Sequence, residues 1–530
     1  MHSGIEDFIR RFTKRLSPAE RAYREARWRL ATTGTEEAQN ELVRAGLAYT
    51  ELFADTGEFE RVRGWYGERE DIRDPALRRQ VEILYRMFAG NQGAREVLEH
   101  VEELEAKANA IYSNHRSVLR GREVGENEIR EILRLSGDPE LRREAWEASK
   151  TVGREVEPVV RQLARLRNEL AREQGYENHY ERSLDLQEID GGRLRSIMAE
   201  LERSTEEPFR KFKEGLDAEL EERFGVEAVH PWLLSDPFFQ EPPEQPDLDV
   251  DRYFRGKSLE DLTARTYGSM GLEVRDVMQK SDLYERPNKD QHAFCTVIGR
   301  EHPYDVRVLA NVRPDSYWMN TMLHEFGHAV YDKYIDPSLP YLLRTVAHTS
   351  STEAIALMMG ALADDEGWLR EIAGVPREEL AADAPKLDLR RRADRLVFTR
   401  WALVMFHFEQ VLYENPDRDD LNRVWWDLVE RLQLVERPPE RDEPDWAAKI
   451  HIATAPVYYH NYVLGDLTAA QLRAYLEREV AGGPFFLSED AGDHLKEAFF
   501  APGARESWDA TVVRATGEEL DPAHFVRSLG

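Results

Sequence analysis

Two histidines and a glutamate, His324, Glu325 and His328, have the types and spacing needed to bind a metal and move a proton. Side chains four residues apart lie on one face of an α-helix, so two neutral imidazoles with this spacing can hold one Zn²⁺. Glu325 directly follows the first histidine and could take a proton from a water molecule at that metal. This H-E-x-x-H motif also occurs by chance in unrelated proteins, so alone it predicts a zinc site but not which bond is broken.

A third metal ligand is needed, because catalytic zinc usually takes three ligands from the protein. Glu353 is the best candidate, since it is a lone carboxylate at the start of the strongly apolar run 354–359. Without the upstream motif, this acid would be interpreted as a charge that complements a helix dipole. His348 is a competing ligand nearby, but it lies before the predicted helix.

Helices are predicted to position most of these residues. The segment 315–336 contains no proline, and apolar residues recur at three- and four-residue spacing over most of residues 1–115. The only convincing strands lie in 292–312, where apolar and polar residues alternate and a turn falls at 299–303. The sequence predicts a mainly α protein with a small β-sheet beside the motif helix. An edge of that sheet could pair with an extended peptide.

Composition excludes several classes of partner. The 530 residues carry a formal net charge of -29, and such a field repels phosphate backbones and anionic membrane surfaces. Nucleic acid and membranes are therefore not predicted partners. Cys295 is the sole cysteine, no apolar run is long enough to cross a membrane, and the N-terminus does not read as a signal peptide. These features predict a cytoplasmic protein.

Two motifs together resemble a known family. His-Glu-Phe-Gly-His at 324–328 followed by Ser-Thr-Glu-Ala-Ile at 351–355 resembles the gluzincin metallopeptidases, and specifically the angiotensin-converting enzyme family of peptidyl-dipeptidases. The resemblance runs along most of the chain. The further matching runs are 22–28, 141–176, 267–272, 281–287, 292–293, 425–428, 437–439 and 449–452.

The resemblance implies the composition of the metal site. His324, His328 and Glu353 would bind one zinc ion per chain, and Glu325 would act first as general base and then as general acid. A carboxylate beside a cation suits such a proton shuttle.

The resemblance also implies residues that bind the substrate. His451 and a tyrosine that follows it would donate hydrogen bonds to the oxyanion that amide hydrolysis develops. Lys449 would hold the C-terminal carboxylate of the peptide, which gives exopeptidase character. His292 and Ala293 would align the peptide backbone, with His292 donating to a substrate carbonyl.

The identity of that tyrosine is open, because the family has two tyrosines with Y-x-x-Y spacing. Counting directly from the predicted catalytic histidine gives Tyr458 and then Asn461. Keeping the spacing gives Tyr459 and Tyr462, with one extra residue near Pro456. The second alignment retains a phenol for the oxyanion and is preferred. Tyr458 and Tyr462 are also neighbours four apart on a helix, so both alignments remain.

The sequence departs from the family at positions that bind chloride and brace the metal. The arginine between the family's tyrosines is His460 or Asn461 here, and the arginine after its W-W-x-L run is Val429. Chloride is therefore not expected to be required. The acid four residues after the third ligand is Leu357, so another group must orient one of the zinc histidines.

We expect a single peptidase domain over 1–530, mainly α-helical and two-lobed, with a deep central cleft. Helices in about 1–115 would form a lid, and about 260–480 would form the cleft and zinc site. A closed cleft excludes folded proteins, so the predicted substrates are short peptides. The predicted oligomeric state is a monomer or a weak homodimer.

The preferred reaction is release of C-terminal dipeptides. An alternative is internal cleavage of short peptides, because H-E-F-G-H and the tyrosine-rich segment also resemble the thimet oligopeptidase and oligopeptidase F relatives. A second alternative is a peptide-binding homologue that has lost activity.

Overall fold

The computed structural model describes residues 2–243 and 248–529, and the chain divides into two compact units. Unit 1 comprises Met1–Gln92, Leu248–Leu387 and Leu464–Phe525. Unit 2 comprises Gly93–Asp247, Asp388–Val463 and Val526–Gly530. The structure is 69% helical, so the predicted mainly α class is confirmed. The single peptidase domain, its lid and its cleft stay predictions.

The helices of unit 1 include the one that carries the H-E-x-x-H motif. They are α1 (His2–Thr33), α2 (Glu36–Glu51), α3 (Thr56–Gly67), α4 (Pro75–Gly90), α11 (Leu259–Gly268), α12 (Arg275–Met278), α13 (Ser316–Lys333), α14 (Thr349–Gly360), α15 (Glu366–Glu371), α20 (Glu489–His494) and α21 (Trp508–Thr516).

The helices of unit 2 include the short one that carries His451. They are α5 (Arg95–Asn114), α6 (Glu126–Leu135), α7 (Pro139–Lys150), α8 (Val152–Glu173), α9 (His179–Leu186), α10 (Gly191–Phe224), α17 (Leu421–Gln433) and α18 (Ile450–Thr454). Three more, α16 (Arg377–Glu414), α19 (Tyr459–Tyr475) and α22 (Ala523–Arg527), have residues in both units.

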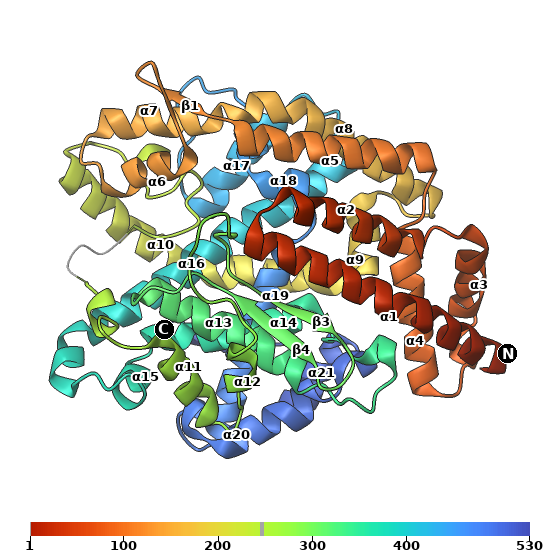
Figure 1. Cartoon of the computed structure of the whole chain (residues 1–530). Coiled ribbons are helices and arrows are strands. Elements are labelled where there is room, and N and C mark those ends of the chain that lie inside the picture. The colour runs from red at the N-terminus through yellow and green to blue at the C-terminus, as the bar shows by residue number, and fades with distance from the viewer. Residues whose placement is uncertain (1, 244–247, 530) are drawn as a thin grey trace. The chain divides into compact units, whose positions relative to one another are not determined.

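The predicted strands in 292–312 are confirmed as an antiparallel pair, β3 (Phe294–Gly299) and β4 (Asp305–Leu309). Both strands pack beside α13, as can be followed in Figure 1. The expectation that they would be the only strands is wrong, because β1 (Ser117–Leu119) and β2 (Arg122–Val124) form a second hairpin. Arg120 and Gly121 at its turn both have positive φ, which is typical of a tight two-residue hairpin turn. Its strands are too short to show a period of two in the sequence.

Helix α13 lies in the core of unit 1. Its apolar side chains, among them Leu323, Phe326 and Val330, are fully buried in one large cluster. The Asp315 carboxylate accepts a hydrogen bond from the Trp318 backbone N–H at 2.8 Å and caps the first turn. Burial and capping therefore hold the motif helix in one position within this unit.

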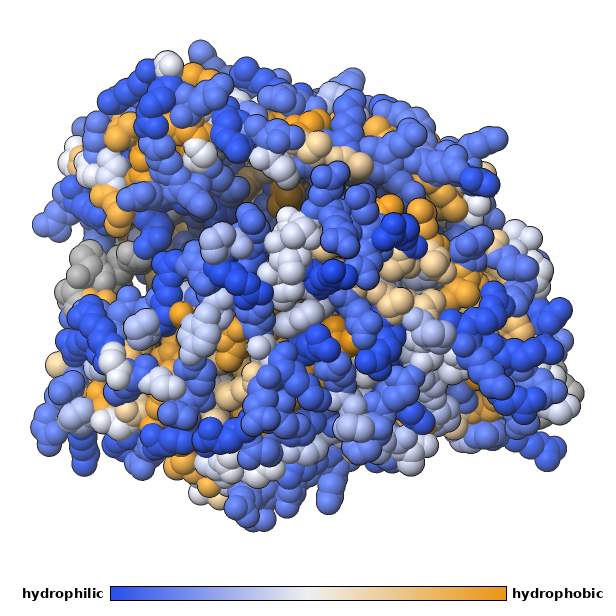
Figure 2. All heavy atoms as spheres, viewed as in Figure 1, coloured by the Kyte–Doolittle hydropathy of each residue, from blue (hydrophilic) through white to orange (hydrophobic). Residues whose placement is uncertain are grey.

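The surface is polar. Figure 2 shows hydrophilic side chains over most of the face that it views, as expected when 33% of residues are charged. None of the helices in 2–243 and 248–529 is both long and apolar enough to cross a membrane.

Candidate active site

Helices α13 and α14 pack closely, and a glycine makes this possible. A Cβ atom on Gly327 would lie 2.8 Å from the Cα atom of Ala356, a distance that real Cβ atoms essentially never show. The glycine inside the H-E-F-G-H run thus lets the helix that carries Glu353 approach the helix that carries the two histidines.

This packing brings the three predicted ligands together. The Nε2 atoms of His324 and His328 lie 3.7 Å and 4.0 Å from the Glu353 Oε2 atom. Among the residues that the structure describes, these three form the one group of His, Cys, Asp or Glu side chains close enough to hold a metal ion. His348 is instead the N-cap of α14, where its side chain accepts a hydrogen bond from the Ser350 backbone N–H at 3.1 Å.

The charge states of the two histidines suit a zinc ion. Burial lowers the pKa of His324 to about 4, and burial and the His324 ring lower the pKa of His328 well below its ordinary value. Both imidazoles are therefore neutral at pH 7 and keep a lone pair for a metal. Burial raises the pKa of Glu353 to about 7. Two imidazole nitrogens and one carboxylate oxygen form a donor set that fits catalytic zinc.

Thr352 supplies a brace for the site. The Nδ1 atom of His328 lies 2.7 Å from the Thr352 hydroxyl oxygen. Because the Nε2 atom of this ring faces Glu353, the Nδ1 atom is free to carry the proton and donate it to that hydroxyl. The sequence showed that Leu357 stands where the resembling family has a bracing acid. It did not show that Thr352 takes the bracing role instead.

Glu325 lies next to this cluster and is almost completely buried, with 8% of its surface exposed. Burial raises its pKa to about 8, and the Glu353 carboxylate adds to the shift. The backbone N–H of Cys295, on strand β3, interacts with the Glu325 carboxylate and lowers the pKa again. The predicted proton acceptor therefore lies at the edge of the small sheet.

That edge of β3 has no strand partner in the described residues, where β3 pairs with β4 alone. Arg24 of α1 donates from its Nη1 atom to the Val297 carbonyl at 2.7 Å, so this carbonyl points away from β4. Backbone groups alternate between the two edges along a strand, and Cys295 therefore shares the edge with Val297. The predicted pair His292 and Ala293 directly precedes β3 instead of lying in it.

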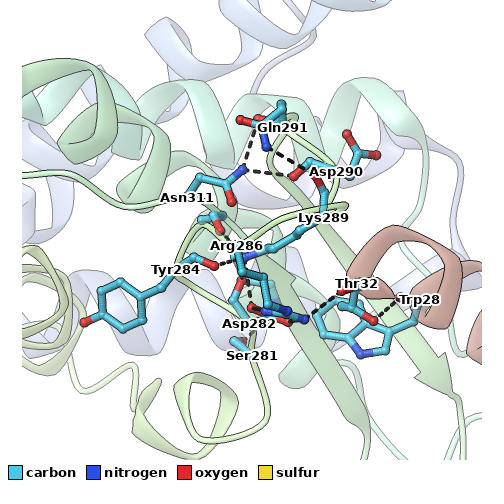
Figure 3. A network of polar contacts seen from close by, with 12 residues as sticks. Trp28, Thr32, Ser281, Asp282, Tyr284, Arg286, Lys289, Asp290, Gln291 and Asn311 are labelled. Carbon is cyan, nitrogen blue, oxygen red and sulfur yellow. Dashed lines mark hydrogen bonds and ion pairs between the residues drawn. The ribbon is translucent and has the colours of Figure 1, made fainter. Parts of the chain in front are cut away.

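A buried ammonium organises the loop before β3, as Figure 3 shows. The Lys289 Nζ atom donates to the Asp282 carboxylate and to three backbone carbonyls, those of Asp282, Tyr284 and Ala310, at 2.5–2.9 Å. Arg286 adds two hydrogen bonds to the same carboxylate and one to the Thr32 carbonyl of α1. These contacts fold the loop around Asp282 and attach it to α1.

The same network extends to the residues before His292. The Asn311 side-chain amide donates to the carbonyls of Asp290 and Gln291 at 3.0 Å and 3.2 Å (Figure 3). The Asp290 carboxylate accepts from the His292 backbone N–H. The Asp290 N–H donates to the Ala31 carbonyl at 2.8 Å. The entrance to β3 is therefore held from both sides.

Lys449 lies in unit 2, in a pocket of aromatic rings. Its Nζ atom lies 5.3–5.8 Å from the ring centroids of Phe238, Trp401 and Tyr459, and it donates to the Gln240 side-chain oxygen. Burial lowers the pKa of Lys449 to about 8. Among the described residues, this buried ammonium has a neutral amide as its hydrogen-bond acceptor, an arrangement that suits a carboxylate from outside the chain.

His451 lies near Lys449 and against Tyr459, with ring centroids 5.2 Å apart. Burial and the charge of Lys449 lower the pKa of this imidazole to about 4, so it is neutral at pH 7. Its Nδ1 atom is buried and has no hydrogen-bond partner among the described residues. The ring therefore keeps hydrogen-bonding capacity for a ligand.

Tyr459 contacts both of these residues and also the second tyrosine of the Y-x-x-Y pair, with 5.6 Å between the ring centroids of Tyr459 and Tyr462. Tyr458 packs against Tyr462 with 5.2 Å between centroids. The contacts of Tyr459 with Lys449 and His451 favour the alignment that assigns Tyr459 and Tyr462 to the Y-x-x-Y pair. Which tyrosine donates to the oxyanion stays a prediction.

Three long-range contacts hold the segment around Lys449. The Tyr112 hydroxyl donates to the Ala447 carbonyl at 2.6 Å, and the Arg167 Nη2 atom donates to the Ala453 carbonyl at 2.7 Å. A Cβ atom on Gly153 would lie 2.4 Å from the Pro444 carbonyl oxygen. Residues from the run 141–176 thus act as supports for this segment.

The structure therefore groups the predicted site residues into two sets. His324, Glu325, His328, Glu353 and the segment at His292 belong to unit 1, whereas the set formed by Lys449, His451, Tyr458, Tyr459 and Tyr462 belongs to unit 2. The sequence interpretation missed Thr352 and Gln240. Gln240 lies in a loop without periodicity, so no sequence signal could have found it.

Two models of known families match the chain. The model described as angiotensin-converting enzyme matches residues 2–213, and the model described as peptidase family M3 matches residues 272–530. The second match contains all three predicted zinc ligands as well as the segment around Lys449. The matches confirm the resemblance that the two motifs suggested.

Proposed function

Because this chain is a zinc metallopeptidase of the angiotensin-converting-enzyme-like gluzincin family, we propose that it hydrolyses short peptides and releases dipeptides from their C-termini. The observation that carries this proposal is the proximity of Glu325 to the edge of β3 that has no strand partner among the described residues. A peptide that adds to this edge as an extended strand has its backbone beside the proton acceptor.

Each residue of unit 1 has a proposed task. Zinc held by His324, His328 and Glu353 would polarise the scissile carbonyl and acidify a water molecule. Glu325 would take a proton from the attacking water and pass it to the leaving amine. Ala293 and Cys295 would pair with the peptide backbone, and the network around Lys289 would keep this edge in place.

The residues of unit 2 would provide the preference for C-termini. Lys449 and Gln240 offer one cation and one amide to a terminal carboxylate. His451 and Tyr462 would donate hydrogen bonds to the oxyanion, and Tyr459 would support Lys449 and His451 through ring contacts. Tyr458 and His292 are assigned to substrate binding. These roles rest on the resemblance and on the local chemistry of each residue.

A blocked-peptide series tests the proposal. The enzyme loaded with zinc is incubated with peptides of increasing length that carry a free or an amidated C-terminus, and the products are identified by mass. Dipeptides removed in sequence from free C-termini support the proposal. Equal rates on free and amidated peptides would show that the terminal carboxylate is not recognised.

Internal cleavage of short peptides is the second candidate. It rests on the resemblance of the H-E-F-G-H run and the tyrosine-rich segment to the thimet oligopeptidase and oligopeptidase F relatives, and both segments lie in the residues that the M3 model matches. Fragments longer than two residues from amidated peptides would support internal cleavage.

We also propose that chloride is not required and that the protein works in the cytoplasm. His460 and Asn461, which stand where the family has an arginine, both lie within hydrogen-bond distance of the neutral Gln187 side chain. A large increase in kcat when chloride is added at constant ionic strength would contradict the first statement. The proposed cytoplasmic location rests on the single cysteine, Cys295.

A further inference from the structure

Val457, two residues before helix α19, has an unusual backbone. Its φ is +54°, in the left-handed region, and its side chain is 1% exposed. A β-branched residue is a true outlier there, because its Cβ substituents crowd the backbone. Such strain persists only where surrounding contacts impose it, and it is common at functional sites.

Two side chains hold the two peptide groups that flank the Cα atom of Val457. Glu409 of α16 accepts a hydrogen bond from the Val457 N–H at 2.7 Å, and the Gln187 amide donates to the Val457 carbonyl at 3.1 Å. Glu409 is 2% exposed, and burial raises the pKa of its carboxyl group to about 8. A buried carboxyl that accepts from one backbone N–H is a costly arrangement, which indicates that the contact has a specific role.

We call Glu409, Gln187 and the Val457 backbone groups that they bind the clamp. Its hydrogen bonds continue into the first turn of α19. The Gln187 side-chain oxygen accepts from the Asn461 amide at 2.8 Å, and the Asn461 N–H donates to the Tyr458 carbonyl at 2.9 Å. One glutamine thus joins the strained peptide to the turn that carries the tyrosines. All of these groups lie in unit 2.

We propose that Glu409 and Gln187 are positioning residues, which hold Val457 in its left-handed conformation and thereby set where Tyr459 and Tyr462 lie. The inference rests on the proposed function, because it assigns the clamp to the reaction through those tyrosines. This role fits the preferred alignment with Y-x-x-Y spacing, which requires one extra residue near Pro456, directly before the left-handed Val457.

The test is a rescue experiment on the full-length enzyme loaded with zinc. Glu409→Ala should lower kcat by about 10- to 100-fold, the range expected for misplaced catalytic groups, with KM and zinc content little changed. Adding Val457→Gly to Glu409→Ala should restore most of kcat, because glycine adopts positive φ without help. Glu409→Gln retains an acceptor and should stay near wild type.

Leu434 offers a matched control, since it also has a positive φ of +52° in unit 2 and is exposed. Leu434→Gly relieves comparable backbone strain away from the clamp and should not restore kcat to Glu409→Ala. If Glu409→Ala does not fold, Gln187→Met is compared with and without Val457→Gly in the same way. Unchanged kcat in Glu409→Ala and Gln187→Met, or equal rescue by both glycines, would overturn the proposal.

Tyr462→Phe separates this inference from the proposed function. If this variant retains wild-type kcat, the role given to Tyr462 is wrong. A loss of kcat in Glu409→Ala that Val457→Gly rescues would then still establish the clamp, acting through Tyr459.

Discussion

The His328 Nδ1 atom lies 2.7 Å from the hydroxyl oxygen of Thr352, the residue that directly precedes Glu353. One turn of α14 thus presents both a predicted metal ligand and the group that would orient another predicted ligand. A hydroxyl carries no charge, so it fixes the imidazole but increases its basicity less than a carboxylate would.

Removing this brace should weaken zinc binding. Thr352→Val retains the shape but loses the hydrogen bond, and we expect the dissociation constant for zinc to rise by about 10- to 100-fold. Competition with a chromophoric chelator measures this constant without any assay of activity. Thr352→Ser is the control, because it keeps the hydroxyl. Equal affinity in the valine variant would contradict the bracing role.

Replacing Glu325 by Gln should abolish most of the hydrolysis while leaving zinc in place. The amide cannot accept the proton, and general-base catalysis contributes about 10²- to 10⁴-fold. Metal analysis should give one zinc per chain in both proteins, because Glu325 is not a predicted ligand. A variant that hydrolyses peptides at the wild-type rate would show that the proton acceptor is another group.

The activity on free C-termini should decrease above pH 8. Burial lowers the pKa of Lys449 to about 8, so its ammonium is charged below this pH and becomes neutral above it. A neutral amine does not attract a carboxylate, so kcat/KM should decrease by about tenfold per pH unit beyond the pKa. Lys449→Arg, which stays charged, should move the decrease to higher pH. The same decrease with amidated peptides would exclude Lys449 as its cause.

The two alignments of the tyrosines make opposite predictions. Tyr462→Phe should lower kcat by about 10²-fold, because one oxyanion donor is lost, whereas Tyr458→Phe should have a small effect. Steady-state kinetics on one short peptide measures both. If Tyr458→Phe has the larger effect, the direct count from His451 is correct and no extra residue is present.

Gly327→Ala should separate α13 from α14. The new Cβ atom would lie 2.8 Å from the Ala356 Cα atom, and overpacking of this kind costs about 1–3 kcal/mol. We expect a lower thermal midpoint together with weaker zinc binding, because Glu353 moves away from the histidines. Gly268→Ala in α11 is the control, since nothing lies within 4 Å of its added Cβ. Normal zinc affinity in Gly327→Ala would show that the close approach is not needed.

The sequence by itself determined the features that depend on local spacing. The positions of His324 and His328 four apart required one helix face, and the alternation in 292–312 required strands, because both periods arise from neighbouring residues. The resemblance then added Lys449 and His451, which no local period could have singled out.

Tertiary structure alone decided which distant groups meet. Thr352 reaches His328 only because Gly327 lets two helices touch, and Gln240 reaches Lys449 from a loop that has no pattern. The left-handed Val457 depends on Glu409, from a different helix. Such contacts join residues far apart in the chain, and their energies arise only when the packed core brings the groups together, so no pattern of neighbouring residues encodes them.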